Sequence, residues 1–142
     1  VELRDVLPTL FDFATGQELA NVDGISLKET LTNPDFQTRE YLHGEHSFGW
    51  DSNQYILTKE WKYIWLPIQG KEQLFNLKED PEERHNCLDE APEIAEKLRQ
   101  ILIAQLVDRE EGFVKEGQLV TLSQTKSTLN FLKARIQGGK ME

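Results

Sequence analysis

The chain has 142 residues, of which 38% are hydrophobic and 29% charged, and its formal net charge is −9. This length suits one domain with a single core. The negative charge opposes attraction to nucleic-acid phosphates and anionic lipids, so neither is expected as a partner. The longest apolar runs, such as residues 101–107, are too short to span a bilayer. The single cysteine, Cys87, excludes a disulfide within the chain.

The first segment predicts a short helix that ends near Gly16. Asp5 is the predicted N-cap, because a carboxylate there accepts hydrogen bonds from the first free backbone N–H groups. A polar connector follows, with the sequence VDGISL at residues 22–27 as a turn. The predicted helix carries an apolar face at helical spacing, which needs a partner surface, formed by Leu7, Leu10, Phe11 and Ala14.

The middle of the chain changes to a strand pattern rich in aromatic and β-branched residues. Turn residues separate the runs, so we predict an antiparallel sheet of four strands at residues 39–46, 53–58, 61–67 and 72–77. An apolar stripe at helical spacing then predicts a long helix over residues 92–109 that packs across one face of the sheet. The fold class is therefore α+β. An extended edge piece and a last helix at residues 128–137 are predicted beyond it.

The segment YLHGEHSFGW places two histidines and a glutamate within four residues. In a strand, His43 and Glu45 share one face and His46 takes the other, so all three reach one metal ion only with a bulge at Gly44. Three interpretations stay open: a metal site, a structural or surface role, and the lining of a substrate pocket. The structural or surface role is favoured over the metal site.

Other catalytic patterns are weak. Cys87 follows His85 in a turn, but a nucleophilic cysteine needs a base that the fold brings from elsewhere. We found no glycine-rich phosphate loop. The residues alone therefore indicate no catalytic residue in this chain, and the metal site at His43, Glu45 and His46 stays the less favoured interpretation.

Several segments together are similar to type I sulfatases of the alkaline phosphatase superfamily. VELRDVLPTLFDFATG resembles the family stretch D-x-x-P-T-L-x-D-x-A-G, and VDGISL resembles D-G-x-S-L. Residues 58–86 resemble the closing pattern, a K-Y-I strand followed by E-x-L-[FY]-x-L and D-P-x-E-x-x-N. The resemblance covers roughly residues 1–109, and a further segment near residue 115 is similar to bacterial arylsulfatase-like tails.

This resemblance implies the C-terminal portion of a sulfatase. It assigns residues 1–38 to the end of the α/β catalytic domain, residues 39–110 to a C-terminal sheet-and-helix subdomain, and residues 111–142 to an extension. In the family, a cysteine or serine becomes formylglycine and Asp and Asn ligands hold Ca²⁺. Cys87 is not in that maturation motif. Formylglycine and Ca²⁺ are therefore expected in a preceding N-terminal domain, and the isolated chain is predicted to be inactive.

The same resemblance implies a partner, a substrate class and a compartment. The partner is the protein's own N-terminal catalytic domain, and the substrate is a sulfated small molecule or glycan. Related enzymes are often periplasmic or secreted. Four residues are predicted to face the substrate cleft, where imidazole, amide and indole groups bind hydroxyls or stack on a ring, namely His43, His46, Trp50 and Gln54.

Two alternatives remain beside this interpretation. One is a free-standing interaction module without catalysis. The other is part of a phosphoesterase or phosphonate monoester hydrolase of the same superfamily. The chain starts at Val1 and its only methionine is Met141, so we expect a processed chain or a piece of a longer one. The apolar helix face predicts that the isolated chain associates with itself.

Overall fold

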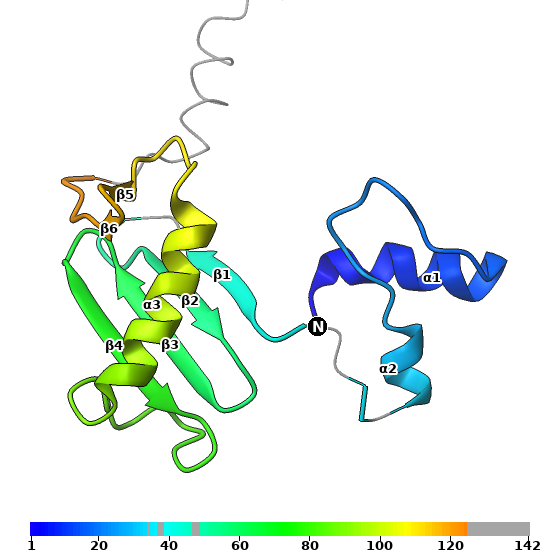
Figure 1. The fold of residues 1–142 in the computed structure, drawn as a ribbon, viewed down its shortest axis with the longest axis horizontal. Helices are drawn as coiled ribbons and strands as arrows, with labels where there is room; N and C mark the ends of the chain where they lie inside the picture. Colours follow the sequence, from blue (N-terminus) through cyan, green and yellow to red (C-terminus); the bar gives the residue numbers. More distant parts are fainter. Residues whose placement is uncertain (34, 37–38, 47–48, 125–142) are drawn as a thin grey trace, which may run out of the picture. The chain divides into compact units, whose positions relative to one another are not determined.

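The computed structural model describes residues 1–33, 35–36, 39–46 and 49–124. The chain divides into two compact units, Val1–Leu42 and His43–Glu142, each of which is considered by itself (Figure 1). The assignment of residues 1–38, 39–110 and 111–142 to parts of a sulfatase stays a prediction. No described helix is long and apolar enough to cross a membrane.

The first unit contains a 3₁₀ turn, Leu3–Asp5, followed by α1, Val6–Thr15, and α2, Lys28–Thr32. Helix α1 ends as predicted: Gly16 takes the left-handed conformation with φ of 69°, and its N–H donates to the Asp12 carbonyl. The predicted capping role of Asp5 is wrong. Its backbone is helical and its carboxylate makes no cap bond to α1, because it is bonded to other groups described below.

The apolar face predicted for the first helix lies at the surface. Leu7 and Leu10 are 62% and 63% exposed, Ala14 is exposed and Phe11 is partly exposed, whereas Pro8 and Thr9 are buried in the unit. Phe13, outside the predicted face, is 53% exposed as well. Inside this unit, the helix therefore packs through the face that carries Pro8 and Thr9. The prediction that the isolated chain associates with itself rests on this exposed face.

The second unit is a four-stranded antiparallel sheet with one long helix, which confirms the α+β class. Its strands lie in chain order: β1, Leu42–His46; β2, Asn53–Leu57; β3, Trp61–Leu66; and β4, Lys71–Asn76. Helix α3, Pro92–Leu106, lies across one face (Figure 1). Two short strands, β5, Val114–Lys115, and β6, Gln118–Leu119, form a separate hairpin. The helix predicted at residues 128–137 lies outside the described residues.

The core lies between the sheet and α3. Ile56 pairs with Tyr63 and Tyr63 pairs with Leu74, so one face presents three fully buried side chains from three adjacent strands. The helix contributes the buried part of the predicted stripe, Leu98, Leu102 and Leu106. The alternation of large apolar side chains along the strands thus selects which face the helix covers.

One polar group in this core has no hydrogen-bond partner among the described residues, the hydroxyl of Tyr63. Burial raises the pKa of Tyr63 above its ordinary value, and the nearby Glu72 carboxylate raises it further. A buried hydroxyl that lacks a partner costs about 1–3 kcal/mol. Tyr63→Phe is therefore expected to raise the free energy of unfolding of this unit by ~1 kcal/mol.

Urea denaturation followed by tryptophan fluorescence measures this change, since all three tryptophans lie in the second unit. Tyr55→Phe is the matched control, because Tyr55 is only half-buried and its hydroxyl lies outside the core. A clear loss of stability in Tyr63→Phe would show instead that the hydroxyl is bonded to Glu72.

Candidate functional site

Strand β1 carries the residues that the sequence singled out, and alternation distributes them over two faces. His43 and Glu45 share the face of the buried Gln54 on β2, to which both are hydrogen-bonded. His46, at the end of β1, is exposed and follows Glu45 directly, so it points to the opposite face. The four predicted substrate-binding residues therefore do not form one cluster.

On the α3 side, four polar side chains form a continuous chain of hydrogen bonds, hereafter the His43–Arg109 chain. His43 Nε2 lies 2.9 Å from Gln54 Oε1, and Gln54 Nε2 donates to Glu45 Oε2 at 3.0 Å. Arg109 Nη2 donates to the same Glu45 oxygen at 3.0 Å. These bonds tie β1 and β2 to the loop that follows α3.

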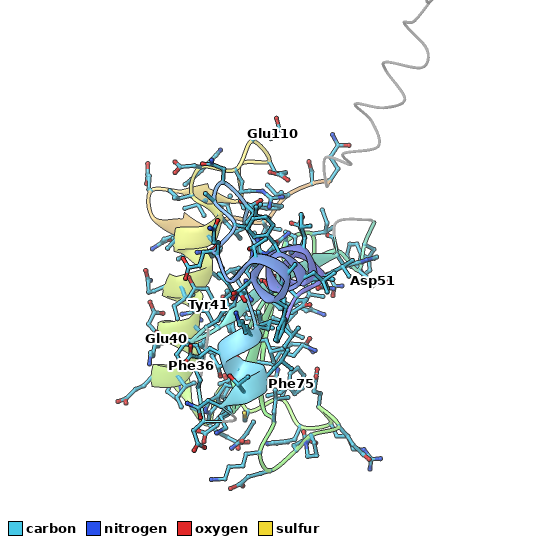
Figure 2. The ribbon with its side chains drawn as sticks, turned by 90° about the vertical axis from the view of Figure 1, so that its right-hand side faces the viewer. Phe36, Glu40, Tyr41, Asp51, Phe75 and Glu110 are labelled. Carbon is cyan, nitrogen blue, oxygen red and sulfur yellow. The ribbon has the colours of Figure 1, made fainter. Side chains whose placement is uncertain are left out.

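Arg109, at one end of the His43–Arg109 chain, carries a stable positive charge. The carboxylates of Glu111, first, and of Glu45 raise the pKa of Arg109, so its guanidinium keeps its charge. The guanidinium also lies 6.0 Å from the centroid of the Phe113 ring, which packs edge-on against Trp65. Figure 2 shows the neighbouring Glu110 beyond the C-terminal end of α3. Glu45 thus has a fixed cation beside it.

The other two predicted residues are accessible. Trp50 is 66% exposed, and its backbone carbonyl accepts from Gln69 Nε2 at 3.3 Å. His46 is exposed as well. Within the described part of the chain, no hydrogen bond joins His46 or Trp50 to His43 or Gln54. The His46 imidazole and the Trp50 indole are therefore exposed, whereas the Gln54 amide is already hydrogen-bonded to His43 and Glu45.

Gly44 has a packing role that the sequence did not reveal. A Cβ atom at this position would lie 2.2 Å from the Cζ and hydroxyl oxygen of Tyr55, so a larger residue would require the Tyr55 ring to move. Lys62 Nζ lies 5.5 Å from the centroid of the same ring. Gly44 therefore serves the sheet face opposite to His43, and β1 runs unbroken through it.

The motifs in the first unit hold its loops together. The Asp5 carboxylate accepts from the Ile25 backbone N–H at 3.0 Å, and Thr9 Oγ1 accepts from the Leu27 N–H at 2.9 Å. Asp12 accepts from the Ser26 hydroxyl at 2.7 Å. Side chains between Asp5 and Asp12 therefore bind three consecutive residues of the VDGISL turn. These polar side chains already form hydrogen bonds that hold the unit together.

The pattern DPEERHN covers the outer edge of the sheet in the same way. Asn86 Oδ1 accepts from the Leu74 N–H at 2.9 Å, and the Cys87 N–H donates to the Leu74 carbonyl at 2.9 Å. The Cys87 thiol is buried and also faces that carbonyl. This segment therefore satisfies the backbone of β4, which would otherwise be an open edge.

The resemblance implies Ca²⁺, which is expected in a preceding domain rather than among the described residues of this chain. No group of three or more His, Cys, Asp or Glu residues lies close enough together to hold an ion within the described ranges. Cys87 also lies in a buried turn that does not match the formylglycine motif. No step of a reaction is therefore assigned to either group here.

No family model matches the chain. It is 45% identical over 122 residues to an arylsulfatase of Clostridium perfringens, an alignment that covers 84% of this chain and 25% of the relative. The fold is similar to that of a 2-O GAG sulfatase, with 26% identity, a TM-score of 0.63 and coverage of 78% of this chain and 26% of the other.

A second structure of the same fold was solved in complex with its substrate, D-glucosamine-2-N,6-O-disulfate. It has 24% identity and a TM-score of 0.61, and the match covers 75% of this chain and 24% of that one. The chain thus spans about a quarter of the length of these proteins. Its motifs fit the C-terminal region of such an enzyme. The sequence identity and the shared fold together show that this chain belongs to the sulfatase family.

Proposed function

We propose that this chain is the C-terminal part of an enzyme that hydrolyses sulfate esters. The observation that carries the proposal is the 45% identity to an arylsulfatase over 122 residues. It is supported by the motifs themselves, which occupy structural positions in both units. In this proposal the chain completes the fold and borders the substrate cleft, while formylglycine and Ca²⁺ reside in the N-terminal catalytic domain.

The substrate class that we favour is a sulfated glycan or a small sulfated molecule. A protein of the same fold was solved with a sulfated glucosamine, and a further one is a GAG sulfatase. The exposed His46 and Trp50 offer an imidazole for hydroxyl or sulfate oxygens and an indole on which a sugar ring can stack. His43 offers a second imidazole, which is hydrogen-bonded to Gln54.

The test is a comparison of two proteins with 4-nitrophenyl sulfate. The isolated 142-residue chain is expected to be inactive, and the full-length protein, produced with formylglycine maturation, is expected to release 4-nitrophenol. Turnover of 4-nitrophenyl phosphate or a phenylphosphonate ester in preference to the sulfate would favour the phosphoesterase alternative. Activity of the isolated chain would overturn the division of roles.

His46→Ala is expected to lower kcat/KM of the full-length enzyme for a sulfated monosaccharide roughly tenfold, the value of one hydrogen bond to a charged group. His85→Ala is the matched control, since His85 is exposed but paired with Glu90 in the turn that covers the far edge of the sheet. The expected result is a loss in His46→Ala alone. An unchanged kcat/KM in that variant would remove His46 from the site.

A further inference from the structure

The His43–Arg109 chain determines which proton each of its members carries. A carboxylate accepts hydrogen bonds and cannot donate them, so the Gln54 side chain must turn its NH₂ group toward Glu45. Its carbonyl oxygen then faces His43 Nε2 at 2.9 Å. Because that oxygen only accepts, Nε2 must carry the hydrogen. In the opposite orientation, the Gln54 carbonyl oxygen would face the Glu45 carboxylate oxygen, and neither atom could donate a hydrogen bond.

This order is anchored at the charged end. Arg109 donates to the Glu45 oxygen that also accepts from Gln54, so this oxygen is the acceptor in both bonds. Gln54 is only 1% exposed, so water does not compete for its amide. The direction of the hydrogen bonds thus runs from His43 through Gln54 to Glu45, with Arg109 donating from the other side.

The second nitrogen of His43 is left for another partner. Nδ1 makes no hydrogen bond to any residue that the structure describes, and it is not among the buried polar atoms that lack partners. His43 as a whole is partly exposed. In a neutral imidazole with the hydrogen on Nε2, Nδ1 carries a lone pair and accepts a hydrogen bond.

We propose that Gln54, Glu45 and Arg109 are positioning residues that fix His43 in the Nε2–H tautomer, so that Nδ1 accepts a hydrogen bond from a hydroxyl or amino group of a sulfated sugar. The proposal rests on the function proposed above and narrows the substrate class. An aryl sulfate offers no such donor, whereas a sulfated monosaccharide carries several. Gln54 then acts through His43 and does not contact the substrate.

The tautomer is measured directly in the ¹⁵N-histidine-labelled 142-residue chain, without any activity. Long-range ¹H–¹⁵N correlation at a pH where the ring is neutral should show the hydrogen of His43 on Nε2, with signals assigned by their loss in His43→Gln. Glu45→Leu removes the acceptor of the Gln54 NH₂ group, so the amide is free to rotate and His43 should move toward a mixture of tautomers. Glu72→Leu is the matched control, because Glu72 lies on β4 of the same sheet and also pairs with an arginine, Arg99 of α3.

A His43 hydrogen on Nδ1 in the unmodified chain would overturn the proposal. So would a His43 tautomer that stays unchanged in Glu45→Leu, or one that shifts equally in Glu72→Leu. The proposal requires the hydrogen on Nε2 in the unmodified chain and a change of tautomer in Glu45→Leu alone.

The substrate contact is tested in the full-length enzyme with two substrates. His43→Phe is expected to lower kcat/KM about tenfold for a sulfated monosaccharide and less than twofold for 4-nitrophenyl sulfate. Equal losses on both substrates would overturn the contact with the sugar. If the unmodified enzyme cleaves neither sulfate, the proposed function fails, while the tautomer result still decides the positioning of His43.

Discussion

Asp5→Asn is expected to unfold the first unit while leaving the second intact. The Asp5 carboxylate is fully buried and receives two bonds from Arg39, at 2.6 and 2.7 Å, with further bonds from the Glu2 and Ile25 backbone N–H groups. Removing one partner of a buried ion pair costs about 3–5 kcal/mol. Arg39 keeps its ion pair with Glu2 at 3.2 Å, so we expect the lower end of that range. A unit of this size has little stability to lose.

Amide hydrogen exchange at Ile25 and Leu27 measures the effect, since both N–H groups are bonded to side chains of the first helical segment. Their protection should vanish in Asp5→Asn. The tryptophan fluorescence transition, which reports on the second unit, should stay in place. Asp35→Asn makes the same chemical change at an exposed position and should alter neither. Retained protection in Asp5→Asn would show that the pair adds little.

The same pair predicts how the first unit responds to acid. The Arg39 guanidinium, followed by the backbone N–H groups, lowers the pKa of Asp5 well below its ordinary value of 3.8. A carboxyl group whose pKa falls on folding stabilises the folded state above its unfolded pKa. That contribution is lost as pH falls below about 4. Ile25 exchange protection should therefore weaken in acid, and Asp35→Asn, at an exposed position, should show the same pH dependence.

Gly24→Ala is expected to cost the first unit about 3 kcal/mol, at the upper end of the range for overpacked sites. A Cβ atom at Gly24 would lie 1.9 Å from the Arg4 carbonyl oxygen and 2.5 Å from its carbon. Both are backbone atoms, so no side-chain rotation relieves the clash. The VDGISL turn would have to move away from the 3₁₀ turn and give up the bond between Ile25 and Asp5.

Gly16→Ala separates this clash from the ordinary cost of replacing a glycine. Gly16 has a φ of 69°, but a Cβ atom there meets nothing within 4 Å. Its cost is limited to the left-handed backbone, about 1–2 kcal/mol. Exchange at Leu27 in both variants gives the comparison. Equal losses at the two positions would mean that the contact with Arg4 is not what requires glycine.

The strands and helices of the second unit were predictable because each is encoded by neighbours in the sequence. Alternating aromatic and aliphatic residues indicated β2, β3 and β4, and a stripe that includes Leu98, Leu102 and Leu106 indicated α3. Local periodicity selects the buried face, and burial then fixes how sheet and helix meet. The end of α1 at Gly16 was predictable for the same local reason.

The prediction for Asp5 failed because its role depends on a distant residue. Sequence spacing indicated a helix cap, whereas the carboxylate is bonded to Arg39, which lies 34 positions away. The sequence did not predict the role of Arg109, because its partner Glu45 lies 64 positions away and no local pattern indicates such a pair. Whether Gln54 binds a substrate or positions His43 likewise depends on its burial.

The sequence by itself determined the family, the class of fold and the order of its elements, because motifs and periodicity are local properties of the chain. Only the tertiary structure decided the partners of its polar side chains. It joined His43 to Arg109 through Gln54 and Glu45, and it left His46 and Trp50 exposed. A hydrogen bond requires two groups within about 3 Å, and the folded backbone alone sets that distance between residues far apart in sequence.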